Sequence, residues 1–143
     1  MKSVKSGWKG KITNSMEESI FLGIELAKVI EKGDIYALNG ELGSGKTTLI
    51  KGVLEGLEFK GEVTSPTFTL VNEYNSNPLV INIDCYREQD LNRWQSIGIQ
   101  EYFESGCIVF IEWAEFIKPL LPNRVIPVSF LHIAENRRKI NIF

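Results

Sequence analysis

The chain has 143 residues, which is the usual length of one domain and leaves little for a second. A chain of this length buries roughly 70% of its unfolded surface, so its core needs neither disulfides nor metals. Hydrophobic residues make up 43% and charged residues 24%, the composition of an ordinary globular protein. The formal net charge of −2 argues against direct electrostatic capture of nucleic acid, so any RNA is expected to be reached through a partner. We predict one domain over residues 1–143.

The cysteines and the hydropathy pattern indicate the compartment. Cys85 and Cys107 stand alone and His132 is the only histidine, so the sequence offers no zinc spacing and no secreted disulfide scaffold. The N-terminal lysines are followed by no apolar segment of the kind found in signal peptides. No apolar run approaches the roughly 20 residues that cross a bilayer. We therefore expect a cytoplasmic protein with no membrane association.

The first helix and the first buried strand are marked by their end signals. Ser15 is a predicted helix N-cap, and Glu18 completes a capping box three residues later. Gly33 ends the helix, and the almost entirely apolar run 34–40 then fits a strand buried on both faces. The apolar residues at helical spacing between these signals are Met16, Ile20, Ile24, Ala27 and Ile30.

A phosphate-binding motif follows that strand directly. Gly40, Gly45, Lys46 and Thr47 reproduce the spacing G-x-x-x-x-G-K-[ST] of a P-loop. Apolar residues at three- and four-residue steps after the motif predict an amphipathic helix ended by Gly56 or Gly61, which completes the strand–loop–helix context of a P-loop. The loop amides and the helix N-terminus would then face phosphate oxygens. The expected nucleotide-binding residues of this segment are Glu41, Leu42, Gly43, Ser44, Gly45, Lys46, Thr47 and Thr48.

The remaining elements alternate between strands and short helices. Pro127 suggests that one of the two C-terminal strands lies at a sheet edge. We expect an α/β fold: a single P-loop NTPase domain with a mainly parallel central sheet flanked by helices and antiparallel strands at the C-terminal end. The predicted elements are a loop at 61–68, strands at 68–74 and 79–86, short helices within 90–104 that break near Gly98, a strand at 106–113, a short helix at 114–122, and two final strands that turn near Glu135.

Two carboxylates end apolar strands and are the candidate catalytic and metal-binding acids. Glu112 ends the run IVFIE, and an acid there would lie beside the P-loop, where it can hold Mg²⁺ or orient the attacking water. Asp84 ends the run INID and is either a second carboxylate at the metal, a helix N-cap or a solvated loop charge. Lys46 would reach the β- and γ-phosphates, and the Thr47 hydroxyl would ligate Mg²⁺.

Two further segments are candidates for nucleotide contact. The small polar loop Ser65, Pro66, Thr67 and Phe68 lies one helix after the P-loop, where other nucleotide hydrolases place a switch that senses the γ-phosphate. The basic run 137–139 is typical of a solvated turn, although one of its arginines could contact nucleotide or a partner.

Motifs that are absent from the sequence exclude some classes of nucleotide-binding protein. The sequence has no N-K-x-D segment of the guanine-reading type, so ATP is the expected nucleotide. Small-molecule kinases usually carry an arginine-rich lid, and the scattered Arg87 and Arg93 leave that class open. A nucleotide-sensing adaptor without catalysis is a second alternative.

Four segments in one order, GELGSGKTTLIKG, SPTFTLVNEY, IDCYR and IEWAE, closely resemble the bacterial TsaE family of small P-loop ATPases. The resemblance covers the chain from the helix after Ser15 to Arg137. It implies ATP hydrolysis that is weak alone and activated by the TsaB–TsaD heterodimer, which places a threonylcarbamoyl group on an anticodon-loop adenosine of tRNA. Hydrolysis would support repeated cycles of modification rather than the transfer itself.

The resemblance also implies roles for individual residues. Lys46 and Thr47 hold phosphate and Mg²⁺, while Asp84 and Glu112 match the two acids of the family. The segment Ser65 to Phe68 matches its switch-like loop. The nucleotide base is expected near Thr13 to Ser15, so Ser15 and Arg137 join the expected nucleotide-binding residues. Departures from the family pattern at Asn82, Ile83, Cys85 and Ala114 remove no phosphate or metal ligand, although contacts to the partner could differ.

Overall fold

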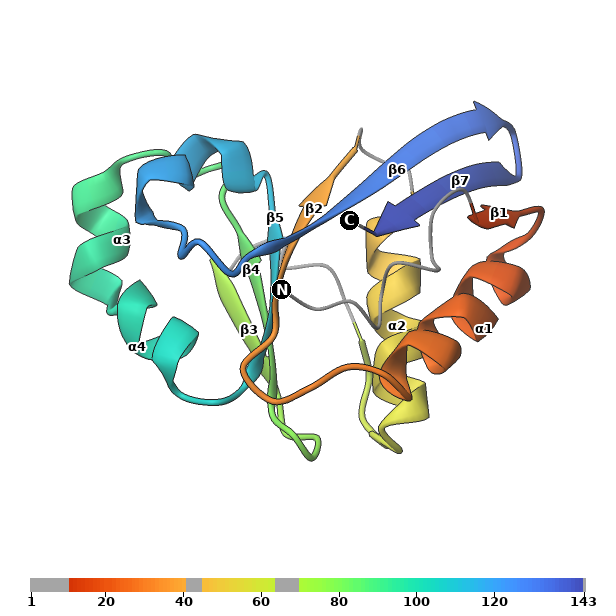
Figure 1. Cartoon of the computed structure of the whole chain (residues 1–143), viewed down its shortest axis with the longest axis horizontal. Coiled ribbons are helices and arrows are strands. Elements are labelled where there is room, and N and C mark those ends of the chain that lie inside the picture. The colour runs from red at the N-terminus through yellow and green to blue at the C-terminus, as the bar shows by residue number, and fades with distance from the viewer. Residues whose placement is uncertain (1–10, 41–44, 64–69, 143) are drawn as a thin grey trace.

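The computed structural model describes residues 11–40, 45–63 and 70–142, which form one seven-stranded sheet with helices on both faces (Figure 1). The strand order is β1-β7-β6-β2-β5-β4-β3. The strands are β1 Lys11–Thr13, β2 Ile35–Asn39, β3 Val71–Tyr74, β4 Val80–Asp84, β5 Ile108–Glu112, β6 Ile126–Ala134 and β7 Arg137–Ile142. The helices are α1 Met16–Ala27, α2 Lys46–Gly56, α3 Leu91–Ile97, α4 Ile99–Glu104 and the 3₁₀ segment η2 Ala114–Leu120.

The centre of the sheet is parallel and the two C-terminal strands pair antiparallel, as predicted, and β1 and β3 are further antiparallel strands. β2 pairs in parallel with β5 and β6, and β5 pairs in parallel with β4. β7, β1 and β3 add antiparallel strands at the two sides. The expectation that Pro127 marks an edge strand is wrong, because β6 lies between β2 and β7. Pro127 is opposite Ala37 of β2, whereas the pairing with β7 begins at Val128, so the missing N–H of the proline breaks no bond to β7.

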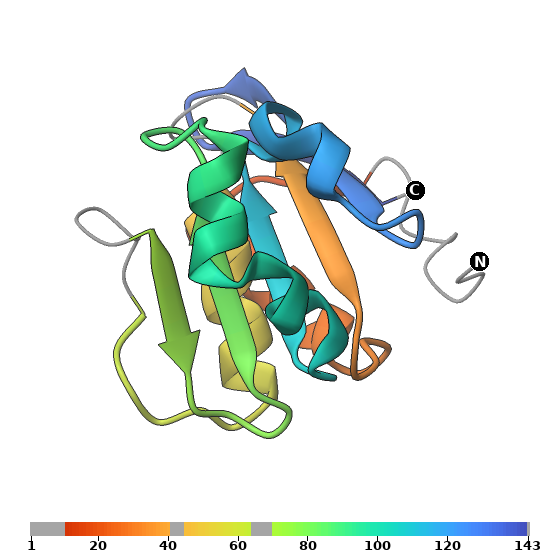
Figure 2. The same cartoon turned by 90° about the vertical axis from the view of Figure 1, so that its left-hand side faces the viewer.

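Strand alternation divides the core into two clusters. In β2, Tyr36 and Leu38 face one cluster while Ile35 and Ala37 face the other. The first cluster is covered by α1 and α2, and the second by α3, α4 and η2, which Figure 2 shows in front of the parallel strands. Within the described ranges, no helix combines the length and hydropathy needed to cross a membrane.

The two helices on the first face meet through glycines. A Cβ on Gly23 of α1 would lie 2.4 Å from the Leu49 carbonyl oxygen, and a Cβ on Gly52 of α2 would lie 2.2 Å from the Ile20 carbonyl oxygen. Such distances leave no room for a side chain, so the backbones pack directly. The buried face of α1 is therefore centred on Gly23, and Met16, which the apolar spacing places on that face, is 63% exposed.

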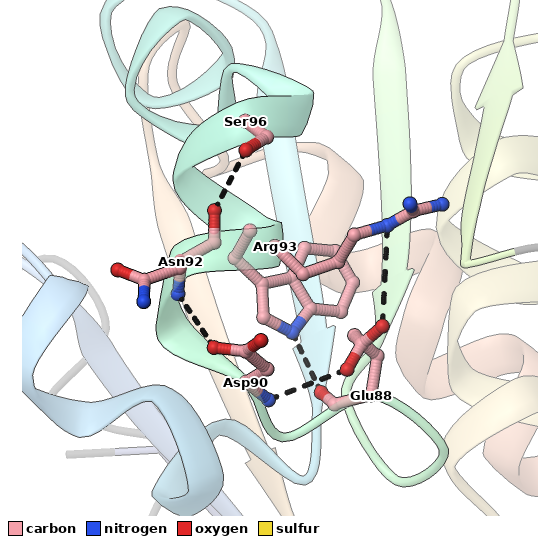
Figure 3. A network of polar contacts seen from close by, with 6 residues as sticks. Glu88, Asp90, Asn92, Arg93 and Ser96 are labelled. Atoms are coloured by element: carbon pink, nitrogen blue, oxygen red, sulfur yellow. Dashed lines mark hydrogen bonds and ion pairs between the residues drawn. The ribbon is translucent and has the colours of Figure 1, made fainter.

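The segment between β4 and α3 is fixed by a local polar network (Figure 3). The Asp90 side chain is the N-cap of α3 and accepts a hydrogen bond from the Asn92 backbone N–H at 3.0 Å. The Glu88 backbone carbonyl accepts from the buried Trp94 indole at 2.6 Å, and its carboxylate lies 3.9 Å from Arg93 Nε. These contacts hold the segment between Asp84 and Asp90 against α3.

Candidate functional site

The candidate site lies at the carboxyl edge of the parallel strands. Asp84, the last residue of β4, is directly opposite Glu112, the last residue of β5, and Glu112 is also opposite Leu38 of β2. Because parallel strands end at the same edge, both predicted acids lie where β2 gives way to the segment that leads into α2. The two strand-end acids singled out from the sequence are therefore neighbours at one edge of the sheet.

Lys46 begins α2 beside these acids. Gly45, the N-cap of α2, has a φ of 105°, a left-handed conformation that favours glycine, and Lys46 is only 5% exposed. Its Nζ donates a hydrogen bond to the Gly40 carbonyl at 3.0 Å and lies 4.8 Å from the centre of the Trp113 ring. The ammonium is thus held at the carboxyl edge, between the end of β2 and an aromatic face.

Trp113 belongs to an aromatic cluster that sequence reasoning missed. It adopts a left-handed backbone, with φ 59° and ψ 41°, where the chain leaves β5 for η2. Its ring stacks on Phe116 at 5.8 Å with an interplanar angle of 7°, and lies 5.0 Å from the Tyr86 ring. The signal was the tryptophan directly after the strand-end acid, but the contact with Lys46 depends on the turn that this backbone makes.

Burial dominates the electrostatics of Glu112. Its side chain is almost fully enclosed, which raises the pKa of the carboxyl above its ordinary value because desolvation disfavours the charged form. The neighbouring Asp84 carboxylate raises this pKa further, while Lys46 and a hydrogen bond from Asn82 lower it. Asn82 Nδ2 donates to Glu112 Oε2 at 3.3 Å. Burial and Asp84 therefore favour the neutral form of Glu112, while Lys46 and Asn82 favour its charged form.

Asp84 has a more open position. It is half-buried, and its Oδ1 accepts a hydrogen bond from the Tyr86 backbone N–H at 2.9 Å. The alternative that Asp84 caps the following helix is wrong, since Asp90 is the N-cap of α3. In the described ranges no group of three His, Cys, Asp or Glu side chains could hold a metal. Hydroxyl and carboxylate oxygens with phosphate and water are the donors Mg²⁺ prefers, and Thr47 and Asp84 offer that chemistry.

The helix packing places the start of α1 beside the start of α2. A Cβ on Gly23 would meet Gly52, and one on Gly56 would meet Ala27, so the two helices run in the same direction. Their N-termini consequently lie at the same end. Ser15 is the N-cap of α1 and its Oγ accepts from the Glu18 backbone N–H at 3.1 Å, as predicted.

Arg138 lies beside the start of α2, while the nucleotide contact expected of Arg137 stays a prediction. A Cβ on Gly45 would lie 3.9 Å from Arg138 Cγ, and Arg138 is paired with Thr13 across β7 and β1. Arg137 is exposed at the start of β7. Because side chains alternate along a strand, Arg137 and Arg138 point to opposite faces of the sheet. The sequence alone does not tell which of them faces α2, and the register with β1 does.

Several predicted residues have no described surroundings. Glu41, Leu42, Gly43 and Ser44, and the switch-like segment Ser65 to Phe68, lie outside the described residues. Thr47 and Thr48 are half-buried in the first turn of α2.

The match to a known family decides which family this chain belongs to. The sequence model described as threonylcarbamoyl adenosine biosynthesis protein TsaE matches residues 13–140. The chain belongs to the TsaE family. Its match extends from the end of β1 to the middle of β7 and so contains every described residue of the candidate site. The family role is in the biosynthesis of threonylcarbamoyladenosine in tRNA.

Individual TsaE relatives support this assignment along the whole chain. The TsaE protein of Bacillus subtilis is 35% identical over 141 residues, which cover 98% of this chain and 85% of the relative. The TsaE protein of Haemophilus influenzae is 42% identical over 110 residues, or 76% and 70% of the two chains. The crystal structure of Bacillus subtilis YdiB is similar with a TM-score of 0.76 and 29% identity, covering 92% of this chain and 82% of that one.

Proposed function

We propose that this TsaE-family chain is a Mg²⁺-dependent ATPase of the cytoplasm that works with TsaB and TsaD to support repeated rounds of tRNA threonylcarbamoyladenosine modification. The observation that carries the proposal is the convergence of Lys46, Asp84 and Glu112 at one edge of the sheet, beside the N-terminus of α2. A phosphate-binding helix, a cation and two carboxylates are the parts that phosphoryl transfer to water requires.

Phosphate binding rests on α2 and Lys46. The N-terminus of a helix presents unpaired N–H groups and a partial positive charge to an anion. Lys46 Nζ, which the Gly40 carbonyl holds at the carboxyl edge, would there balance the charge of the terminal phosphates. Ser15 and Arg138 border the same end of the helix pair and are the proposed contacts for the rest of the nucleotide.

The metal and the attacking water are assigned to the oxygen donors. Thr47 and Asp84 would hold Mg²⁺, which when bound neutralises charge that develops on the phosphate oxygens. Glu112 would orient and accept a proton from the attacking water, because a carboxyl with a raised pKa is a better base than an ordinary one near neutral pH. Its burial beside Lys46 keeps competing solvent away from the reacting group.

The product of ATP consumption tests the proposal against a small-molecule kinase. Purified chain with TsaB–TsaD and radiolabelled ATP should release inorganic phosphate in proportion to ADP. Transfer of the label to a metabolite, with no free phosphate, would support the kinase. Arg93 is held near Glu88 in the α3 network, which gives no support to an arginine lid.

A second experiment tests the alternative of a nucleotide-sensing adaptor. Glu112→Ala should keep nucleotide binding but limit reconstituted tRNA modification to about one turnover per complex. Modification at the wild-type multiple-turnover level by this variant would mean that hydrolysis is not the contribution of this subunit.

A further inference from the structure

We propose that Asn82 is a positioning residue that fixes the orientation of the Glu112 carboxylate at the active edge of the sheet. This inference rests on the proposed ATPase function, because it assigns to Asn82 an effect on the turnover that Glu112 supports. Asn82 lies in the middle of β4, one strand away from Glu112 on β5.

Strand geometry brings the two side chains together. Asn82 is opposite Phe110 in the parallel register, so Glu112 is its diagonal neighbour two residues further along β5. Phe110 and Val80 belong to the cluster that faces α2, and residues two apart on a strand share a face. Asn82 and Glu112 therefore both face the layer that contains Lys46.

The contact between them has one chemically consistent direction. Asn82 Nδ2 lies 3.3 Å from Glu112 Oε2, and an ionised carboxylate can only accept hydrogen bonds. The amide nitrogen must therefore face Glu112 when that acid is charged. A planar amide held in this way limits the rotation of the carboxylate and stabilises its charged form.

Asn82 is a buried polar residue whose hydrogen-bonding capacity is only partly used in the described residues. Asn82 is 1% exposed, and its Oδ1 makes no hydrogen bond within the described ranges. A buried amide with one unpaired atom costs roughly 1–3 kcal/mol relative to a satisfied one. Other buried polar side chains pair locally: Thr13 with Ser19, and Asp34 with Tyr36.

This cost indicates a role in the site rather than in stability alone. The other charged groups that act on Glu112 are the Lys46 ammonium, which favours its charged form, and the Asp84 carboxylate, which disfavours it. Asn82 is the neutral donor among them. With Nδ2 committed to Glu112, the remaining amide oxygen is free to accept a hydrogen bond from a water molecule next to the carboxylate.

The test compares Asn82→Leu, which keeps the shape and removes the donor, with Asn82→Gln, which keeps an amide. With TsaB–TsaD present, Asn82→Leu should lower kcat roughly ten- to hundredfold, as loss of such supporting groups does, with the Kd for ATP unchanged. Asn82→Gln should recover part of the loss. Tyr36→Phe is the matched control, because it removes a buried hydrogen bond to a carboxylate, Asp34, at the far end of the same sheet. Wild-type kcat in Asn82→Leu, or an equal loss in Tyr36→Phe, would overturn the inference.

A measurement without nucleotide separates this inference from the ATPase proposal. In the ligand-free protein, the ¹³C resonance of the Glu112 carboxyl should move in Asn82→Leu and stay in place in Tyr36→Phe. An unmoved resonance in Asn82→Leu would refute the positioning role, whether or not the chain hydrolyses ATP. If the wild-type protein releases no phosphate, with or without TsaB–TsaD, the ATPase proposal is refuted. The Glu112 resonance would still show whether Asn82 positions the carboxylate.

Discussion

Asp84 and Glu112 lie directly opposite each other at the ends of neighbouring parallel strands, and their environments differ. Glu112 is buried beside Lys46 and Asn82, whereas Asp84 is half-buried and accepts a hydrogen bond from the Tyr86 backbone. Two carboxylates with different surroundings at one edge can divide two tasks. The enclosed acid suits contact with the attacking water, and the more open acid suits the metal.

The raised pKa of Glu112 predicts a pH dependence of stability. The folded chain keeps the Glu112 proton to higher pH than the unfolded chain, whose ordinary value is 4.5. The free energy of unfolding therefore loses this contribution as pH rises from about 4.5 through the folded pKa, and then levels off. Glu112→Gln has no such loss, so its stability relative to wild type should increase across that window. Urea unfolding without nucleotide measures this, with Glu104→Gln as an exposed control; a difference that is flat with pH would contradict the account.

The charge of Asp84 contributes to the same effect. Asp84→Asn removes a neighbouring negative charge and should lower the pKa of Glu112, although burial still keeps it above the ordinary value. The pH window in which wild-type Glu112 costs stability should therefore become narrower. The difference in the free energy of unfolding between Asp84→Asn and the double variant Asp84→Asn/Glu112→Gln is followed with pH. Comparing it with the difference between wild type and Glu112→Gln measures the change. An unaltered window would show that the two carboxylates do not interact.

The glycine contact between α1 and α2 predicts a stability effect far from the chemistry. Gly52→Ala places a methyl group against the Ile20 carbonyl and should reduce the free energy of unfolding by roughly 1–3 kcal/mol. Lys51→Ala, one residue earlier on the exposed side of α2, should change it by less than about 0.5 kcal/mol. Denaturant unfolding of both variants is the measurement. A Gly52→Ala protein with the free energy of unfolding of wild type would mean that α1 and α2 are not in direct backbone contact. The conclusion that their N-termini lie together would then be contradicted.

The two adjacent arginines of β7 should behave differently. Arg138 Nη1 donates to the carbonyls of Ala134, Glu135 and Arg137, which fastens the β6–β7 turn while its stem lies against Gly45. Arg138→Ala should therefore reduce stability by about 1–2 kcal/mol and weaken ATP binding. Arg137→Ala should affect both only slightly, because Arg137 is exposed. Calorimetric titration with ATP compares the two variants, and stronger weakening by Arg137→Ala would mean that Arg137, and not Arg138, contacts the nucleotide.

Much of this site could be predicted because its signals are local. The strand-end acids Asp84 and Glu112, the Ser15 cap and the Gly45–Lys46 helix start each depend on neighbours in the sequence. What could not be predicted depends on tertiary contacts. The packed face of α1 is set by Gly23, and apolar spacing does not detect a glycine, so that spacing wrongly predicts that Met16 is buried.

The choice between Arg137 and Arg138 and the position of Pro127 depend on strand order, which local sequence does not determine. Pro127 tolerates an interior strand because pairing with β7 starts one residue later. Asn82 looks like any polar residue in a strand until the register sets it beside Glu112. Such residues become visible only when neighbouring strands are known.

The release of phosphate from ATP by the purified chain, with and without TsaB–TsaD, tests the central claim most directly. The account predicts slow release by the chain alone, marked stimulation by the heterodimer, and no release above background from Lys46→Ala under either condition, since the proposed role of its ammonium is to stabilise the phosphate charge. Equal release by wild-type protein and Lys46→Ala, or the absence of any stimulation by TsaB–TsaD, would contradict it.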